Sequence, residues 1–450
     1  MVVGDLAIEA DVVVVGAGPG GYVAALRAAQ LGRQVVLVDP NPPGGTCLRE
    51  GCIPSKALLT AVSHAHNIPN LAEMGIYVGE ATVDWPRMQR WKEGVVGGLS
   101  KGVAQLLKGN GVEVVAGNGR FLQPDQLWVE SQYATHRFAF DQAIIATGAE
   151  AAAWPELLFD GERVLTPIQA LQLEARPETL TVIGSDYIAA EIATIFAKLG
   201  TAVTLWTGAV GLLPDFDPTA GRLVGAQLRK LGVKLPKGAA EPPTEGLVVV
   251  SNGIVPRTAA LDLALAGVET DGAGFVRVNG QMQTSNPNIF AVGDITGHLP
   301  LATLAIKQGK VAAEVVGGKT AVFAPQAIPR IAWTDPEVAA VGLTTAQAEQ
   351  LGYEVVNGRF PLGANGRAQT LNAANGVVLT VAEAETELLL GVTIVAPHAS
   401  DLIGEAALAI EMGATLTDLA ETLHPHPGLG EALLESAESA LGRAVHILTR

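Results

Sequence analysis

The order of hydrophobic and polar positions repeats itself in two parts of the chain. The apolar run Val12–Val15 leads through a glycine-rich turn into the helical segment GYVAALRAAQLG and then into a second apolar run, QVVLV. Residues 179–206 repeat this order, from TLTVIG through an apolar helical segment to AVTLW. Buried parallel strands read as continuous apolar runs, and glycine turns that open helices are typical of nucleotide-binding folds. The pattern predicts two such strand–helix–strand modules.

The pattern changes from about residue 327 onward. The stretches IAWTDPEVAAVGLT and GVVLTVAEAETELLLGVTIV are rich in strand-forming residues, and amphipathic helices are predicted near 402–412 and 430–441. The predicted fold is therefore α/β, with two Rossmann-like dinucleotide-binding domains and a C-terminal α+β domain. The predicted boundaries are 1–150 for the first domain, 151–265 for the second, 266–326 for a return segment that completes the first, and 327–450 for the last.

Composition and charge narrow the classes of function. The chain is 48% hydrophobic and 16% charged, which is typical of a compact globular protein. A formal net charge of −16 argues against nucleic acid or an anionic membrane as a partner. The longest uncharged apolar run, Val12–Leu26, is too short and too rich in glycine to span a membrane, and the N-terminus lacks a secretory signal pattern. With only two cysteines, a reducing cytoplasm is the expected location.

The first glycine motif predicts a dinucleotide site. Gly16, Gly18 and Gly21 follow a predicted strand and open a predicted helix, and Asp39 follows the next strand. Glycines let a pyrophosphate approach backbone N–H groups at a helix N-terminus, and the acidic residue accepts hydrogen bonds from ribose hydroxyls.

The two cysteines, Cys47 and Cys52, lie five positions apart in GGTCLREGCIPSK. On a continuous α-helix this separation is roughly 7.5 Å of rise, beyond the reach of about 7 Å that an unstrained disulfide allows between Cα atoms. The cysteines are therefore either two buried small residues or a redox pair, with Cys47 on a loop that folds back onto Cys52. The glycines of this stretch favour the loop, and Pro54 suits the first turn of a following helix. A thiolate at a helix N-terminus is stabilised, so Cys52 is placed to be reactive.

Three further motifs accompany these two. ATG lies at 146–148, FAVGD at 290–294 and HPHPGLGE at 424–431. The five motifs in this order resemble the flavin-dependent pyridine nucleotide–disulfide oxidoreductases, and among them the dihydrolipoyl dehydrogenases. The resemblance runs essentially from end to end.

The resemblance implies FAD in the first nucleotide site, with Asp39 on the adenosine ribose and Asp294 on the ribityl chain of the flavin. It further implies that Cys47 exchanges with the substrate disulfide, whereas Cys52 lies over the flavin and becomes the charge-transfer thiolate. The full set of cofactor-binding residues that it implies is Gly16, Gly18, Gly21, Asp39, Gly45, Thr46, Thr147, Gly148, Gly293, Asp294 and Ala302.

A base is needed because thiol–disulfide exchange requires a thiolate. His426 has a carboxylate, Glu431, five residues on that can orient its imidazole, whereas His424 reads as structural. The resemblance implies a homodimer in which this histidine reaches the disulfide of the partner subunit, with a dithiol or a lipoyl-bearing protein as substrate. It also pairs Lys56 with Glu191, and a cation near the flavin would stabilise its reduced anionic form.

The second nucleotide motif departs from the family pattern. Asp186 stands where the second glycine is expected, Ala189 replaces the third, and Thr207 stands where an NAD site has an acid. Residues 236–246 form only a short Pro- and Gly-rich loop where relatives have an antiparallel meander. A carboxylate at position 186 opposes a pyrophosphate, so NAD binding is uncertain.

Two other functions remain open, and a third is disfavoured. The first is an FAD-dependent disulfide oxidoreductase with an electron partner other than NAD(P), and the second is a non-catalytic FAD-bound assembly subunit. The third, glutathione-type reduction with NADPH, is disfavoured because no arginine cluster for a 2′-phosphate follows the second module. No metal site is predicted.

Overall fold

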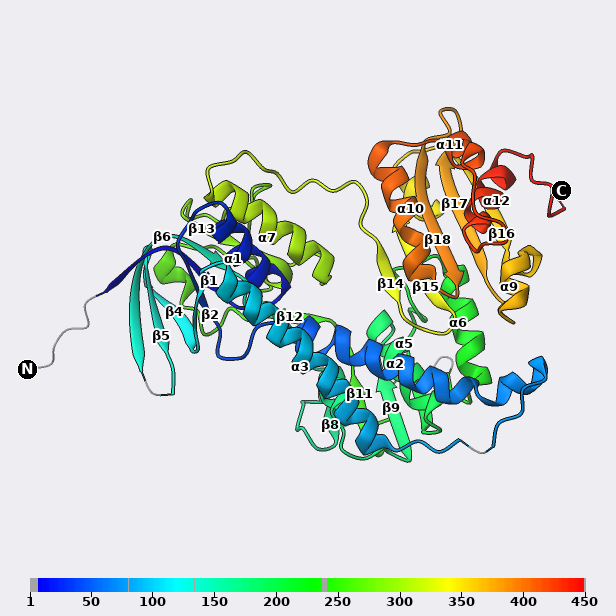
Figure 1. Ribbon diagram of the computed structural model, residues 1–450, viewed down its shortest axis with the longest axis horizontal. Helices are drawn as coiled ribbons and strands as arrows, with labels where there is room; N and C mark the ends of the chain where they lie inside the picture. Colours follow the sequence, from blue (N-terminus) through cyan, green and yellow to red (C-terminus); the bar gives the residue numbers. More distant parts are fainter. Residues whose placement is uncertain (1–6, 80, 133, 237–240, 449–450) are drawn as a thin grey trace, which may run out of the picture.

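The computed structural model describes residues 7–79, 81–132, 134–236 and 241–448. Figure 1 shows three sheet-containing regions, with the first nucleotide module at one end of the molecule and the C-terminal sheet at the other. The long helices α2 (Cys52–Asn67) and α3 (Trp85–Gly109) run between them. The predicted fold class, with two nucleotide modules and a C-terminal α+β domain, is confirmed. The predicted domain boundaries stay predictions.

The first sheet is the larger nucleotide-binding sheet. Its strands β3, β2, β1 and β6 are parallel, β13 also pairs in parallel with β6, and the hairpin β4–β5 extends the sheet in antiparallel fashion. Val12–Val15 are buried completely or nearly so, as the continuous apolar run predicts. The elements are β1 (Ile8–Val15), α1 (Pro19–Gln30), β2 (Val35–Val38), η1 (Thr46–Glu50), α2, η2 (Pro69–Met74), α3, β3 (Glu113–Val115), β4 (Asn118–Gln123), β5 (Gln126–Glu130), β6 (Thr135–Ile145), β13 (Ile289–Ala291), η4 (Gly293–Thr296) and α7 (Ala302–Val316).

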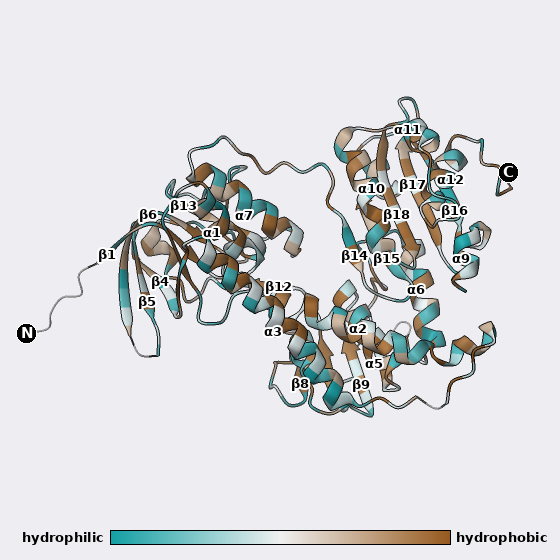
Figure 2. Cartoon of the chain, viewed as in Figure 1, coloured by the Kyte–Doolittle hydropathy of each residue, from teal (hydrophilic) through white to brown (hydrophobic). Residues whose placement is uncertain are grey.

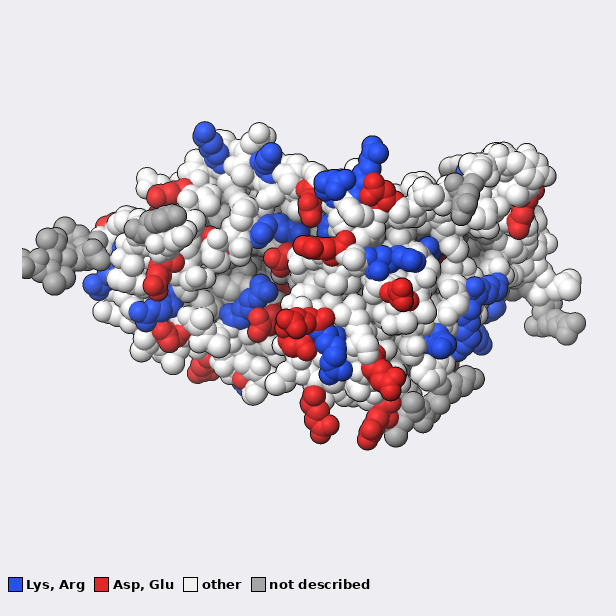
Figure 3. All heavy atoms as spheres, turned by 90° about the horizontal axis from the view of Figure 1, so that it is seen from below, with Lys and Arg blue, Asp and Glu red and all other residues white. Residues whose placement is uncertain are grey.

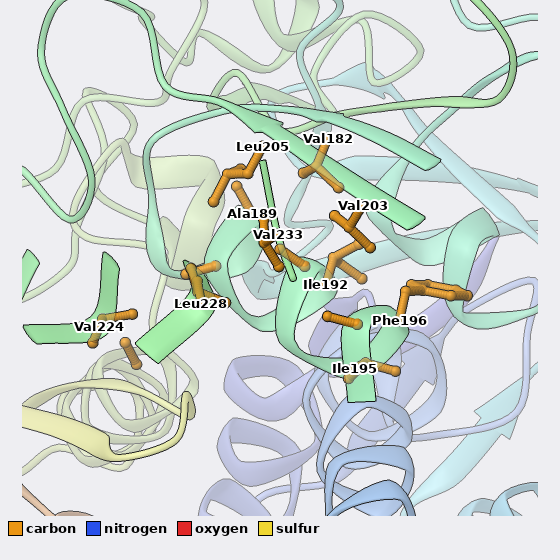
Figure 4. Close-up of a cluster of buried hydrophobic side chains, with 14 of the residues drawn as sticks. Val182, Ala189, Ile192, Ile195, Phe196, Val203, Leu205, Val224, Leu228 and Val233 are labelled. Carbon is orange, nitrogen blue, oxygen red and sulfur yellow. The ribbon is translucent and has the colours of Figure 1, made fainter. Parts of the chain in front are cut away.

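The second sheet is smaller and wholly parallel, in the order β10-β9-β11-β8. Its central helix α5 is buried throughout residues 189–198, because the α-helix is apolar on nearly every side. Figure 4 shows Ile192, Ile195 and Phe196 of this helix in one cluster with side chains of β9 and β10. The elements are β7 (Ala149–Ala151), β8 (Val164–Leu165), α4 (Pro167–Leu171), β9 (Thr179–Ile183), α5 (Tyr187–Lys198), β10 (Ala202–Trp206), α6 (Pro218–Lys230), β11 (Val248–Val250), β12 (Ile254–Pro256) and η3 (Leu263–Ala266).

The two modules differ in the segment that follows α3 in the first module and α6 in the second. The first has the β4–β5 hairpin, whereas the described residues between α6 and β11 form no hairpin. The short loop predicted at 236–246 includes residues 237–240, which lie outside the described residues.

The C-terminal sheet is antiparallel, in the order β14-β15-β18-β17-β16. Side chains alternate between its faces along β15, so that Ala339 and Val341 pack under the helices of this domain while Val338 and Ala340 share the core of the second module. Both faces are therefore apolar, as the brown central strands of Figure 2 show. The elements are β14 (Arg330–Ala332), β15 (Glu337–Gly342), α8 (Thr345–Gln350), β16 (Val355–Pro361), η5 (Leu362–Ala364), α9 (Gly366–Thr370), β17 (Val377–Glu383), β18 (Leu389–Ala396), α10 (Ala399–Met412), α11 (Leu416–Glu421) and α12 (Glu431–Ala440).

The surface carries charge of both signs. On the face seen in Figure 3, acidic and basic side chains are interspersed. Within the described ranges, no helix combines the length and the apolar character that crossing a membrane requires.

Candidate active site

The turn after β1 is shaped for close approach of a phosphate. Gly16 has a φ of 104°, and a Cβ added there would lie 2.3 Å from the carbonyl oxygen of Ala146. The N-cap of α1 is Gly18, which has no side chain to bond the first-turn N–H groups, so these donors remain available to an anion. The carboxylate of Asp39 accepts a hydrogen bond from the amide of Ala17 at 2.7 Å, which places it beside this turn.

The segment that carries the cysteines packs against the glycine-rich turn after β1. The amide of Gly44 donates to the carbonyl of Ala17 at 2.8 Å, and a Cβ on Gly45 would lie only 2.4 Å from Cα of Gly18. Gly45 also has a φ of 58°, so a side chain is excluded there on both grounds. Thr46 follows and begins η1.

The cysteines lie where a π-helical turn meets an α-helix. The expected loop that folds Cys47 back onto Cys52 is a helical turn: Thr46–Glu50 form a π-helix, and α2 begins at Cys52 itself. The amide of Gly51 donates to the carbonyl of Thr46 at 2.7 Å, which is the i to i+5 bond of a π-turn. Because this winding brings residues five apart together, Cys47 and Cys52 come into contact and their thiols hydrogen-bond. Both cysteines are free, so this is the reduced form of the pair.

The two thiols differ in acidity. The hydrogen bond from Cys47 and, to a smaller extent, the charge of Lys56 lower the pKa of Cys52 against the opposing effect of burial. The same hydrogen bond, with burial second, raises the pKa of Cys47. The negative charge of the reduced pair therefore resides on Cys52.

The cation next to this thiolate is held by a buried carboxylate. Lys56 Nζ lies 2.7 Å from Glu191 Oε2, and the amide of Trp333 donates to the other carboxylate oxygen at 3.0 Å. The ammonium also lies 5.6 Å from the centre of the Trp333 ring. Because Glu191 is buried, both of its oxygens need such partners.

The other side of the nucleotide site is built from the turns after β6 and β13. Thr147 Oγ1 donates to the carbonyl of Arg257, and the amide of Gly293 donates to the Gln308 side chain. Among the described residues, nothing hydrogen-bonds to the carboxylate of Asp294, although burial raises its pKa. A half-buried carboxylate without a partner fits a ligand that supplies hydroxyl donors, and the glycine turn fits a diphosphate, so these residues suit FAD. Gly148 and Ala302 border the same turns.

His426 and Glu431 form a carboxylate–imidazole pair at the start of α12. His426 Nδ1 lies 2.7 Å from Glu431 Oε1, and the amide of Gly428 donates to Oε2 at 2.8 Å. Nδ1 is thereby assigned as the donor and Nε2 is left free to take a proton. The imidazole is 81% exposed. By contrast, His424 is buried and hydrogen-bonded at both ring nitrogens, to Thr422 and Glu405, which agrees with a structural role.

The folded chain brings most of these residues together, but one pair stands apart. The cysteines, Lys56 and Glu191 adjoin the first nucleotide turn, whereas no hydrogen bond or ion pair within the described parts of the chain joins His426 to either cysteine.

Comparison with known proteins decides the family. The model of the family described as "Pyridine nucleotide-disulphide oxidoreductase" matches residues 10–240 and 244–309, and that of its dimerisation domain matches 328–437. The chain belongs to this family. It is similar to the dihydrolipoyl dehydrogenases of Haloferax volcanii (43% identical, 100% of both chains) and Geobacillus stearothermophilus (42% identical, 100% of both chains). The crystal structure of LpdA from Mycobacterium tuberculosis superposes with a TM-score of 0.88 at 28% identity, covering 95% of this chain and 99% of that one.

Membership confirms the resemblance found in the sequence. The protein is a flavin disulfide oxidoreductase of the dihydrolipoyl dehydrogenase type, FAD is the cofactor of its family, and the dimerisation domain supports a homodimer. The roles of the individual site residues stay proposals.

Four residues of this region escaped the sequence reasoning. The amide of Gly117 donates to the carbonyl of Asp39. The sequence GNG after an apolar run, which is typical of a turn after a strand, could have identified this residue. Ser251, Trp333 and the partly buried Tyr187 carried no signal, because each meets its partners only through the fold.

The acidity of Cys52 leads to a spectroscopic prediction. Two-electron reduction of the holoprotein should give a long-wavelength absorption band, because the lowered pKa of Cys52 favours a thiolate beside oxidised flavin. Cys52→Ser should abolish the band, whereas Cys47→Ser, which has no disulfide to reduce, should show it before any reductant is added, because Cys52 is then already a free thiol beside oxidised flavin. Reduction of the wild type directly to colourless flavin, with no such band, would exclude this assignment.

Proposed function

We propose that the protein transfers electrons between flavin and a dithiol of the dihydrolipoyl class through Cys47 and Cys52, and that NAD and NADP are poor partners. The relatives named dihydrolipoyl dehydrogenase support the substrate class. The exclusion of NAD and NADP is supported by the difference between two helix N-termini: that of α1 has no side-chain cap, whereas that of α5 is capped by Asp186.

The thiol chemistry assigns a separate role to each cysteine. One substrate thiolate attacks Cys47 of the oxidised pair, and Cys52 leaves as the stabilised thiolate. The second substrate thiolate then attacks the mixed disulfide, which releases Cys47 and the substrate disulfide. Two electrons thus pass from the dithiol to the cysteine pair, and bound FAD supplies the chemistry that accepts them.

The proton leaves through the imidazole. His426 Nε2 takes it from the substrate thiol, and Glu431, which holds Nδ1, stabilises the imidazolium. Because the exposed His426 has no contact with the cysteines described in its own chain, we assign it to the cysteine pair of the partner subunit.

The anion site at the start of α5 is already filled. The carboxylate of Asp186 accepts from the amide of Ala189 at 2.8 Å and from the Ser251 hydroxyl at 3.0 and 2.8 Å. It therefore turns inward and caps its own helix, whereas α1 begins at uncapped Gly18. Burial raises the pKa of Asp186, and these hydrogen bonds oppose the shift by favouring the carboxylate.

A dinucleotide meets two obstacles in the second module. Its pyrophosphate would need the donors that Asp186 occupies, and Thr207 after β10 offers no carboxylate to a ribose. The electron partner is then something other than NAD(P), which leaves the dithiol half-reaction intact.

A single experiment tests both parts. The FAD-loaded protein is mixed anaerobically with dihydrolipoamide, NADH or NADPH, and flavin absorbance is followed in a stopped-flow instrument. We expect fast reduction by dihydrolipoamide and slow, non-saturating reduction by either nucleotide at millimolar concentration. Failure of dihydrolipoamide to reduce the protein would refute the substrate class, and rapid reduction by micromolar NADH would refute the exclusion of NAD.

A further inference from the structure

The flavin site of this chain is rich in carboxylates and poor in cations. A diphosphate bound at the turn after β1 would bring two negative charges close to Asp39, and Asp294 lies in the same site. The first turn of α1 contains no basic residue, and the single basic residue of its last turn, Arg27, is bound to Glu314 at 2.9 Å. Lys56 is likewise committed to Glu191. Backbone donors alone would then have to offset this charge.

One arginine, Arg257, is placed to supply a positive charge to the flavin site. Arg257 follows β12, the short strand that pairs with β7 where the two nucleotide modules meet (Figure 1). Its amide donates to the carbonyl of Gly148 at 3.0 Å, and its carbonyl accepts from Thr147 Oγ1 at 3.0 Å. Its backbone is thereby fixed to the turn after β6.

That turn touches the phosphate-binding turn. A Cβ on Gly16 would lie 3.0 Å from the amide nitrogen of Thr147, so Thr147 packs against the glycine turn on one side and bonds to Arg257 on the other. On the far side, β12 packs beside η4, which carries Asp294. The charge of Arg257 opposes the burial-induced rise in the pKa of Asp294, so the guanidinium is within electrostatic reach of that carboxylate.

The guanidinium is also weakly engaged. Its one ion pair among the described residues is to Glu150 at 3.8 Å, beyond hydrogen-bond distance. The two side chains are 43% and 62% exposed, and such a pair contributes little to stability. Little is therefore lost if the side chain leaves Glu150.

We propose that Arg257 is a cofactor-binding residue that pairs with the diphosphate of FAD and offsets the charge of Asp39 and Asp294. The inference depends on FAD as the cofactor and is independent of the dithiol chemistry and of the state of the second nucleotide site. An arginine suits this task because its planar guanidinium bonds phosphate oxygens in pairs.

The test is FAD affinity and needs no turnover. Apoprotein is titrated with FAD, and the dissociation constant is read from fluorescence quenching at low and high salt. Arg257→Ala should raise the constant about 10- to 100-fold at low salt, the effect of losing a charge-assisted hydrogen bond, and less at high salt. Arg257→Lys should recover part of the loss, because a lysine keeps the charge without the paired bonds.

Two controls separate cofactor binding from structure. Arg120→Ala removes an arginine of similar exposure on β4 that pairs with Asp262 at 3.5 Å, and its FAD affinity should stay within twofold of wild type. Glu150→Gln removes the resting partner of Arg257 and should leave FAD binding unchanged or tighter. An Arg257→Ala affinity within twofold of wild type would overturn the proposal, and so would an equal loss in Glu150→Gln, which would assign the ion pair a purely structural role.

Discussion

Replacing His426 with glutamine should slow reduction of the flavin by dihydrolipoamide by about 10²–10⁴-fold, the usual contribution of a positioned general base. Glutamine keeps a polar side chain next to Glu431 but has no nitrogen that can take a proton near neutral pH. The measurement is the single-turnover rate of flavin reduction by dithiol, with FAD content determined in parallel. FAD content should not change, because His426 lies on the C-terminal domain and contacts Glu431 there.

A matched control is available on the same domain. His398 is also exposed and lies near a carboxylate, at 3.6 Å from Asp401. Since its φ is 57°, asparagine is the substitution that tolerates this backbone best. In the His398→Asn variant, dihydrolipoamide should reduce the flavin at the wild-type rate. If His426→Gln were equally fast, His426 would have no part in the proton transfer.

The second large effect is a gain of function. Asp186→Gly combined with Thr207→Glu should allow NADH to reduce the flavin in a saturable way that the wild type does not show. Like charges at about 4 Å and an effective dielectric near 20 repel by roughly 4 kcal/mol, and even half of this weakens binding about 30-fold. Glutamate at 207 restores an acceptor for ribose hydroxyls, which adds hydrogen bonds of about 0.5–1.5 kcal/mol each.

The double variant should fold, because glycine at an N-cap costs only a few tenths of a kcal/mol relative to the preferred caps. Asp217→Gly is the control, since Asp217 caps α6 in the same module by accepting from the amide of Thr219. It removes a cap without freeing the start of α5, so NADH should remain ineffective. A wild type already saturated by micromolar NADH would contradict the premise, and a double variant no faster than wild type would show that Asp186 is not the obstacle.

The sequence by itself determined the modules and most of the chemistry. The apolar runs of β1 and β9 identify them as parallel strands, because a strand that is buried on both faces needs apolar residues at every position. The glycines at 16, 18 and 21 and the pair Cys47 and Cys52 are local motifs whose meaning depends on spacing. The position of Asp186 within a degenerate motif was likewise visible in the sequence.

Only the tertiary structure decided how the cysteines meet and which groups lower the pKa of Cys52. A five-residue spacing suits neither an α-helix nor a single obvious loop, and the π-turn forms where Gly45 is pressed against Gly18, a contact between segments 27 residues apart that spacing cannot reveal. The acidity of Cys52 depends on Lys56, which in turn depends on Glu191 from another module and Trp333 from a third.

The orientation of the Asp186 side chain, toward its own helix and Ser251, could not be predicted from the sequence either. Whether that side chain faces a ligand or its own helix depends on Ser251, which lies 65 positions away and reaches it through the pairing of β11 with β9. Arg257 reaches the flavin site in the same way, through a two-strand ladder between the modules. Local patterns determine which elements form, because propensity and periodicity act over a few residues. Hydrogen-bond partners distant in sequence are set by how those elements pack, and in this protein they determine what each carboxylate and thiol can do.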